Sequence, residues 1–453
     1  MLRQLFAIAR ITFVEAVRQP IFFVLVMAGG LLQIFNTLLS AYSMEYTDSA
    51  EVVKDNKMLL DMGLATTLAL SALLAAFIAT NILSREIDNH TALTVISKPL
   101  GRPVFVLGKF LGASGALLTA TTLQIIFLLY ALRHGVLSTS ADMIDGPVLL
   151  FASLAVVGSI AVGAWGNFFY GWVFSSATIA VMLPASIAAL AAIYLIDKEW
   201  RLQPITTDLK PQVLLASAAL LLATTLLTAL AIAASTRLKQ VMTIALCAAV
   251  FLLGLMSNYL LGRWAYRNEP VARIAQAQPV RDRDEDLADP ADLWTLRLRE
   301  AATVELSPGL AISYGPVPNG LDLAVRIPPH GYEGDPSVDA DLTTSEKGKA
   351  LVVREVDAQD SRTVTIANAG GVSVKRLPKE GDYLFTTPTR INALAWLAWA
   401  VIPNLQFFWL VDAVAQAHPI PLSYMGLLVL YTLVQTTGLL AVAVALFQKR
   451  DVG

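Results

Sequence analysis

The chain has 453 residues, of which 56% are hydrophobic and 15% charged, with a mean hydropathy of +0.61 and a formal net charge of −2. Soluble globular proteins are usually about a quarter charged, so this composition argues against an ordinary cytosolic enzyme. It also argues against disorder, because so apolar a chain would collapse or insert into a membrane. The single cysteine, Cys247, excludes an intrachain disulfide and a cysteine-based metal site.

The first 19 residues precede the first long apolar run and predict an amphipathic helix. Leu5, Ala9 and Phe13 fall on one side of a helical wheel, whereas Glu15 and Arg18 fall elsewhere. We therefore predict an interfacial helix on the cytosolic leaflet, ended by Pro20. The alternative is a simple extension of the first spanning helix.

Eight apolar runs are long enough to cross a bilayer, which takes about 20 residues in helical form. Their number and length argue against buried helices of a soluble protein and predict a polytopic α-helical membrane protein, with about eight transmembrane helices. The first seven lie within 20–262 and the last follows near the C-terminus. The runs are 21–42, 61–83, 104–129, 147–169, 172–196, 213–234, 241–261 and 421–447.

The basic residues between these runs predict which side of the membrane each connection occupies. If the N-terminus is cytosolic, the cytosolic side carries eleven Lys and Arg residues, against six in the short loops of the far side. An excess of Lys and Arg marks cytoplasmic loops. We therefore predict that both termini are cytosolic and that the polar stretch 263–390 is extracytoplasmic.

The stretch 263–390 predicts a β-rich extracytoplasmic domain, in the form of a small sandwich. It holds 16 of the 33 Lys and Arg residues and 20 of the 35 Asp and Glu residues, so no basic nucleic-acid surface is indicated. Residues 263–278 could continue the seventh helix outward, and 279–290 resemble a solvated linker. Binding, docking and steric shielding all remain open as roles. The predicted strands are 294–299, 321–327, 350–356, 363–367 and 372–375.

No catalytic, cofactor-binding or metal site is predicted. The segment 101–110 places six residues between Gly101 and Gly108 and a phenylalanine after Lys109, whereas a P-loop needs four residues and Ser or Thr. Hydrolase and zinc-protease motifs are missing from the sequence. Five polar residues inside the spans could line a path or, as we favour, bridge helices by hydrogen bonds: Asn36, Asn81, Gln124, Asn258 and Gln435.

Two further segments have a distinctive pattern. Residues 84–103 begin with a possible N-cap, carry acidic residues in the first turn and end at prolines, which predicts a charged amphipathic helix on the cytosolic face, with a solvated loop as the alternative. A ninth apolar run at 391–412 contains Pro403 and Asn404. A full crossing there would place the basic residues after 447 outside, so we predict a re-entrant or interfacial segment.

Four separated stretches resemble the permease subunit of ABC-2 type exporters. They are ITFVEAVRQPIFFVL at 11–25, SREIDNHTALTVISKPLGRPVFVLGKFLG at 84–112, VIPNLQFFWLVDA at 401–413 and ALFQKRDVG at 445–453. In that family they correspond, in order, to the elbow helix with the first span, the loop into the third span, the Pro-Asn segment before the last helix and the Phe-x-x-Arg-Asp motif at the C-terminal end. The simplest members have six spans and short outer loops, so one helix pair here would be extra, with 172–196 and 213–234 as one candidate.

The resemblance implies a dimeric, non-catalytic permease in the cell (inner) membrane that binds two copies of a separate ATPase. ATP and magnesium would bind to that partner, and this chain would hold no cofactor. Residues 1–19, with Glu15 and Arg18, would form the elbow helix. A membrane scaffold that transmits force without moving a substrate is the alternative. The helix at 84–103 would be the coupling helix, contacting the ATPase through Arg85, Glu86, Asp88, Thr91, Lys98 and Arg102.

Overall fold

The computed structural model divides the chain into two compact units. The transmembrane unit comprises Met1–Gly254 and Leu405–Gly453, and the barrel unit comprises Leu255–Asn404. The residues that the structure describes are 2–40, 51–84, 101–136, 143–281, 286–318, 323–328, 331–415 and 419–448.

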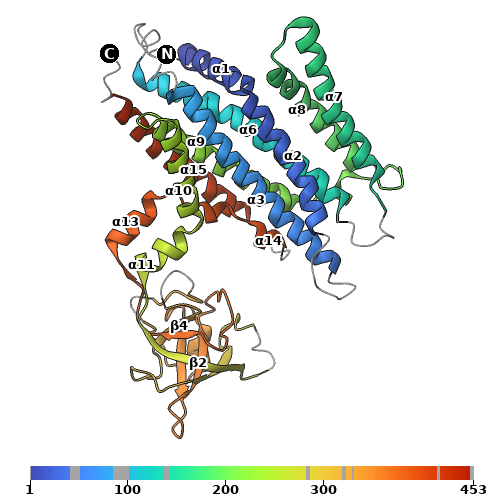
Figure 1. Ribbon diagram of the computed structural model, residues 1–453. Helices are drawn as coiled ribbons and strands as arrows, with labels where there is room; N and C mark the ends of the chain where they lie inside the picture. The colour runs from blue at the N-terminus through green and yellow to red at the C-terminus, as the bar shows by residue number, and fades with distance from the viewer. Residues whose placement is uncertain are drawn as a thin grey trace. The chain divides into compact units, whose positions relative to one another are not determined.

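The transmembrane unit is a bundle of long helices that run side by side (Figure 1). Seven of the described helices are long and apolar enough to cross a membrane, which confirms the prediction of a polytopic helical protein. The seven are α2 (Pro20–Ser40), α3 (Glu51–Ala79, continued by the π-helical turn η1 at Thr80–Ser84), α6 (Arg102–His134), α7 (Gly146–Tyr170), α8 (Phe174–Leu195), α9 (Pro211–Ser235) and α15 (Leu422–Gln448).

The predicted span 241–261 is not one continuous helix. Helix α10 (Gln240–Leu255) is followed by a π-helical turn η3 (Asn258–Gly262) and the short α11 (Arg263–Ala265). Taken together, α10 and the helical segment that follows it are long and apolar enough to cross a membrane, as an eighth and broken span. Asn258 lies at this break, where its Oδ1 accepts a hydrogen bond from Trp399 Nε1 at 3.1 Å. A π-helical turn is one of the recognised causes of such a sharp bend.

Helix α6 lies at the centre of the unit and contacts α1 (Leu2–Arg18), α2, α3 and α9. Glycines on α6 allow α1 to approach closely. A Cβ added at Gly108 would lie 2.7 Å from Ile8 Cγ2, and one at Gly112 would overlap the carbonyl oxygen of Ala9. Helix α1 therefore packs along the first half of α6. A single residue separates the end of α1 from the start of α2 at Pro20. The location of α1 at a membrane surface stays a prediction.

Hydrogen bonds join neighbouring helices at several of the polar positions, as predicted. Asn36 Nδ2 donates to Thr66 Oγ1 at 3.2 Å between α2 and α3, and Asn81 Nδ2 donates to Gln19 Oε1 at 2.9 Å. Gln124 differs, because it is fully buried on α6 and its amide has no hydrogen-bond partner among the described residues. The predicted bridging hydrogen bonds are therefore present at Asn36 and Asn81, whereas the Gln124 side chain packs among its neighbours without such a bond.

The barrel unit contains a closed six-stranded β-barrel with the strand order β2-β3-β6-β5-β4-β7. The β-rich prediction is confirmed, but the predicted sandwich is wrong, since the first half of the long β2 pairs with β7 and the second half with β3, which closes the sheet. The six strands are β2 (Pro270–Pro279), β3 (Leu293–Leu298), β4 (Ala311–Gly315), β5 (Ala350–Val356), β6 (Thr363–Ala369) and β7 (Tyr383–Phe385).

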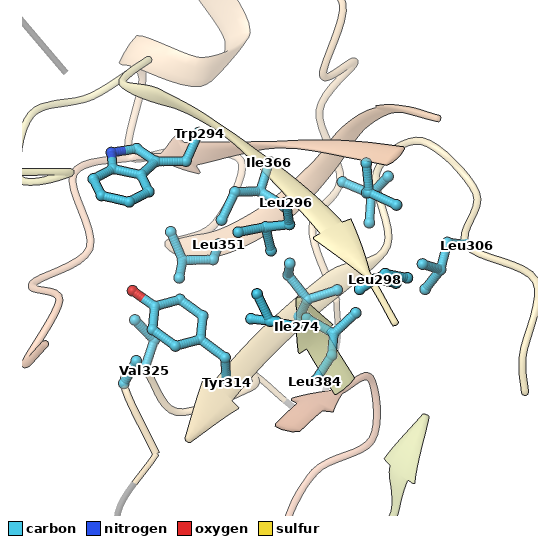
Figure 2. Packing of buried hydrophobic residues seen from close by; sticks show 14 of the residues in the cluster. Ile274, Trp294, Leu296, Leu298, Leu306, Tyr314, Val325, Leu351, Ile366 and Leu384 are labelled. Carbon is cyan, nitrogen blue, oxygen red and sulfur yellow. The ribbon is translucent and has the colours of Figure 1, made fainter. Parts of the chain in front are cut away.

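Apolar side chains from opposite walls fill the barrel interior (Figure 2). Trp294 and Leu296 of β3 lie opposite Ile366 and Val364 of β6 in the antiparallel register. Tyr314 is completely buried, and its hydroxyl donates to the carbonyl oxygen of Arg376 at 2.7 Å. Burial raises the pKa of Tyr314 well above its ordinary value. The phenol is therefore a neutral hydrogen-bond donor in the core at physiological pH.

Several local predictions for this unit are wrong. The seventh helix does not continue through 263–278, because α11 ends at Ala265 and Pro270 opens strand β2. The segment 279–290 is not simply a solvated linker, since Leu287 is fully buried in the barrel core. Residues 372–375 and the described part of 321–327 are not strands. Both contribute side chains to the core from irregular backbone, which apolar content alone does not distinguish from a strand.

The chain enters and leaves the barrel through paired segments, which we call the stem and define as residues 258–269 and 390–404. Strand β1 (Tyr266–Arg267) pairs with β8 (Arg390–Ile391), and Arg390 Nη1 lies 2.7 Å from Glu269 Oε1. Helix α13 (Ala393–Val401) follows and contacts η3 and α11. The compact unit is thus wider than the predicted domain 263–390 at both ends.

Candidate coupling face of the transmembrane unit

The candidate functional site is the end of the transmembrane unit at which α6 begins. Arg102 is the first residue of α6, and Pro103 follows in the first turn, where a missing backbone N–H has no cost. The predicted cytosolic helix was expected to extend through 103, whereas 102 and 103 belong to α6. Of the predicted coupling residues, Arg102 is described, and Arg85, Glu86, Asp88, Thr91 and Lys98 lie outside the described residues.

The start of α6 is attached to the end of α15. Arg102 Nη1 donates to the carbonyl oxygen of Gln448 at 2.5 Å, and the rings of Phe105 and Phe447 stack with centroids 5.6 Å apart. The carbonyls of the last helical turn have no partners within the helix, so the guanidinium satisfies one of them. The first turn of α6 and the last turn of α15 are therefore held together at one end of the unit.

Lys109 lies one turn beyond Phe105 on α6 and links α6 to α1. Its side chain is only 4% exposed, its Nζ lies 3.8 Å from Glu15 Oε2, and the ammonium lies 5.6 Å from the centroid of the Phe105 ring. A buried ammonium needs such partners because burial without them costs several kcal/mol, on the order of the desolvation of one ion. In the sequence, Lys109 was part of a failed P-loop match, of the cytosolic basic residues and of the stretch 84–112, and no pairing with α1 was predicted for it. The acidic residue on the facing amphipathic helix was the signal that could have revealed its role.

The C-terminal end of α1 contacts two further elements. The backbone carbonyl of Arg18 accepts a hydrogen bond from Ser175 Oγ of α8 at 2.8 Å, while the Arg18 side chain is exposed. The neighbouring Gln19 accepts the hydrogen bond from Asn81 in η1. Of the two predicted elbow residues, Glu15 pairs with α6 and Arg18 lies at the contact with α8. Helix α1 is thereby connected to both elements that flank the segment 85–100, namely η1 and α6.

The last two predicted site residues, Pro403 and Asn404, belong to the stem of the barrel unit. Asn404 is buried, and its Nδ2 donates to Asn258 Oδ1 at 2.5 Å. The predicted segment 391–412 was treated as one element. Its helix α13 belongs to the barrel unit, whereas η5 (Leu405–Phe408) and α14 (Val411–Ala415) belong to the transmembrane unit. Whether this segment re-enters a membrane stays a prediction.

A buried ion network lies at the opposite end of α6, and the sequence analysis missed it. Arg133 in the last turn of α6 lies 2.6 Å from Asp145 and 3.1 Å from Asp208. Asp145 has no exposed surface and accepts a hydrogen bond from the backbone N–H of Val148, which caps α7. One guanidinium therefore joins the end of α6 to the residue that caps α7 and to Asp208, which lies shortly before the start of α9. The sequence signal was an aspartate directly before Gly-Pro, a pattern typical of a helix start.

The described part of the chain holds no group of three or more His, Cys, Asp or Glu residues arranged to bind a metal ion. The arrangement at the start of α6 is instead mechanical in kind. It consists of one ion pair, two hydrogen bonds, a stacked ring pair and close helix packing around the two ends of the segment 85–100.

The long apolar helices define a multi-pass membrane protein, and the comparison with known families specifies it further. Residues 6–166 match the family model described as ABC-2 family transporter protein, which supports the ABC-2 permease family. The matched residues include most of α1, all of α2, α3 and α6, and most of α7, and therefore the part of the candidate coupling face that α1 and α6 form. No curated protein matches the chain. No solved structure matches it either.

Proposed function

We propose that this chain is the permease subunit of an ABC-2 type exporter, which uses ATP hydrolysis in a separate subunit to move a substrate across the cell membrane. The family match supports a permease component of an ABC-type transporter, and such a component implies an ABC ATPase partner. The proposal adds the direction of transport, the coupling to hydrolysis, a permease dimer with two ATPase copies and cytosolic termini.

The single observation that carries the proposal is the construction around the segment 85–100. Both its flanks are tied to neighbouring helices: η1 through Asn81 and Gln19, and the start of α6 through Arg102 and Gln448. A segment that is anchored at both ends can transmit displacement to the helices that hold it. We infer that the segment between η1 and α6 contains the coupling helix predicted at 84–103, and that ATP hydrolysis in the partner shifts an equilibrium between two arrangements of the bundle.

The alternative is a scaffold or force-transmitting subunit that moves no substrate. The observation in its favour is the barrel unit, which has its own closed sheet and its own hydrophobic core. Such a module could receive a mechanical signal or hold an extracytoplasmic partner. Both functions require the same ATPase contact and differ in what crosses the membrane.

The ATPase contact can be tested with a charge reversal in the segment 85–100. We expect the double substitution Glu86→Arg with Asp88→Arg to weaken capture of the co-expressed ATPase by at least about tenfold, because like charges would replace oriented ion pairs. The matched control is Glu300→Arg with Glu305→Arg, which reverses two exposed acidic residues of the barrel unit. Full retention of the ATPase by the first variant would rule out this segment as the contact.

Transport and scaffolding are separated by reconstituting the complex of both subunits in sealed vesicles. An exporter shows ATP hydrolysis that rises with a transported compound, together with ATP-dependent accumulation of that compound across the membrane. A scaffold shows hydrolysis that responds to a partner of the barrel unit and no such accumulation. The Glu86→Arg with Asp88→Arg variant should abolish either response.

A further inference from the structure

A lateral groove runs along the transmembrane unit between α2, α6 and α7. Its volume is about 470 Å³. On α2 it extends from Met27 to Leu38, which at the rise of an α-helix corresponds to roughly 16 Å parallel to the helix axes. On the other helices it is lined by residues between Phe127 and His134 and between Val148 and Val157. The groove is therefore elongated along α2, and a helix that spans a membrane runs in the same general direction as the lipid chains.

The body of the groove offers no polar group in need of a partner. The hydroxyl of Thr37 donates to the carbonyl of Gln33 in its own helix at 3.0 Å, and that of Ser153 donates to Leu149 at 2.5 Å. The Gln33 amide donates to the carbonyl of Gly63 on α3 at 3.0 Å. An occupant of the groove consequently meets apolar surface and internally satisfied polar groups, which suits a hydrocarbon chain.

One end of the groove is chemically different from the rest. His134 lines it there, and Lys198 Nζ lies 3.5 Å from the carbonyl oxygen of His134. The indole of Trp200 lies against Gly146 at the start of α7, 6.4 Å from the ring of Phe151, and is 55% exposed. Tryptophan and lysine at one level of a helical bundle are typical of the layer of lipid headgroups. A cation and an interfacial aromatic residue thus mark the level at which a headgroup would lie.

We propose that this groove binds one acyl chain of a membrane phospholipid whose phosphate lies beside Lys198, at the end of the groove that His134 lines. The apolar length of the groove and the cation at its end together match a molecule with a hydrocarbon chain and an anionic headgroup. Arg133 lies in the same turn as His134 but is engaged by Asp145 and Asp208, so it maintains the shape of the rim while Lys198 supplies the attraction for phosphate. This proposal does not depend on the export function.

The experiment uses the full-length protein in lipid nanodiscs that contain phosphatidylethanolamine and phosphatidylglycerol. A trace of phosphatidylglycerol carries a photoreactive diazirine near the end of one acyl chain, and labelled peptides are quantified by mass spectrometry. We expect the label to concentrate on the groove-lining parts of α2 and α7. Ala152→Trp fills the groove and should reduce this labelling on the order of tenfold, because several methylenes lose their contacts.

The matched control is Leu154→Trp, which adds an indole on the same helix at an exposed position that does not line the groove, and should leave the labelling unchanged. Lys198→Gln should reduce the preference for phosphatidylglycerol over phosphatidylethanolamine several-fold without filling the groove. If Ala152→Trp fails to assemble, as judged by size-exclusion chromatography, Ser153→Phe replaces it as the filling variant.

Two results would overturn the proposal. One is uniform labelling around the wild-type bundle, or groove labelling that the filling variant does not change. The other is efficient crosslinking of two copies through Ser153→Cys in a Cys247→Ser background, which would assign the groove to a contact between permease copies. Loss of the ATPase contact with unchanged lipid labelling would affect only the proposed export function.

Discussion

The contribution of Arg133 to stability can be estimated from its buried ion pair. It is 6% exposed and pairs with Asp145, which has no exposed surface at all. Removing one partner of a buried ion pair leaves an uncompensated charge, which costs about 3–5 kcal/mol. The cost arises chiefly from the desolvation of Asp145, and this carboxylate would also lose the group that orients it as the cap of α7.

We therefore expect Arg133→Leu to lower the free energy of unfolding of the transmembrane unit by several kcal/mol, on the order of that for a buried pair. Arg201→Leu is the control, since Arg201 and its partner Glu199 are both largely exposed and such pairs contribute about 1 kcal/mol or less. Thermal and denaturant unfolding in detergent would measure both effects. Equal destabilisation by the two substitutions would show that the buried ion pair of Arg133 contributes no more to stability than the exposed pair of Arg201.

At the scale of elements, the close packing of α1 against α6 depends on small residues. A side chain at Gly112 would collide with the backbone of α1 at Ala9 and with Thr12, and backbone atoms cannot move aside without displacing the helix. Gly158 on α7 has open space around its Cα, so the same substitution there changes only helix propensity. The two glycines therefore form a matched pair for testing the helix contact.

Gly112→Val should destabilise the protein by about 1–3 kcal/mol, the usual cost of overpacking, whereas Gly158→Val should have little effect. We also expect Gly112→Val to separate α1 from α6 and so to expose the Glu15–Lys109 pair to solvent. Protease accessibility of the first 20 residues, compared between the two variants, is the measurement. Protection of α1 in Gly112→Val would show that the two helices do not depend on this contact.

Most of the elements could be predicted from the sequence because membrane-length apolar runs are a strong, local signal. The failures occurred where the determining contact is distant along the chain. Asn258, at the break after Leu255, bonds to the distant Trp399, and the core that buries Leu287 includes strands about 80 residues later. The barrel could not be distinguished from a sandwich because closure depends on one strand pairing on both edges.

The candidate site was predictable in outline only. The charged pattern of 84–103 and the family resemblance pointed to this end of the bundle, where Glu15 pairs with Lys109 and Arg102 donates to Gln448; their predicted roles stay predictions. The role of Lys109 was missed because the lysine and the acidic residue of the amphipathic helix each give a signal, but their separation along the chain does not show that they pair. The partner lies on a helix 94 positions earlier, and only packing brings the two together.

At the scale of the whole molecule, the barrel unit has the features of an independently folding module. Its core is formed by its own strands, and β1 pairs with β8, which brings the two ends of the module side by side. Domains with adjacent termini and a separate core commonly fold in isolation. The fragment 266–391 includes both strands of this closing pair.

We expect the isolated fragment 266–391 to be monomeric and to unfold in a single cooperative thermal transition. Tyr314→Phe should lower its stability by about 0.5–1.5 kcal/mol, because one buried hydrogen bond to the carbonyl of Arg376 is lost. Circular dichroism and calorimetry of both fragments test this. A fragment without cooperative unfolding would mean that the module requires the rest of the chain.

The pairing of β1 with β8 also has a consequence for how such a protein could arise and be re-engineered. Tyr266 lies opposite Ile391, so the chain departs and returns at neighbouring positions of one ladder. A two-residue hairpin turn could join these strands directly in place of the 122 residues between Arg267 and Arg390. The barrel is thus an insertion between two neighbouring backbone positions. A gene could gain, lose or exchange it in one recombination event without altering any helix of the transmembrane unit.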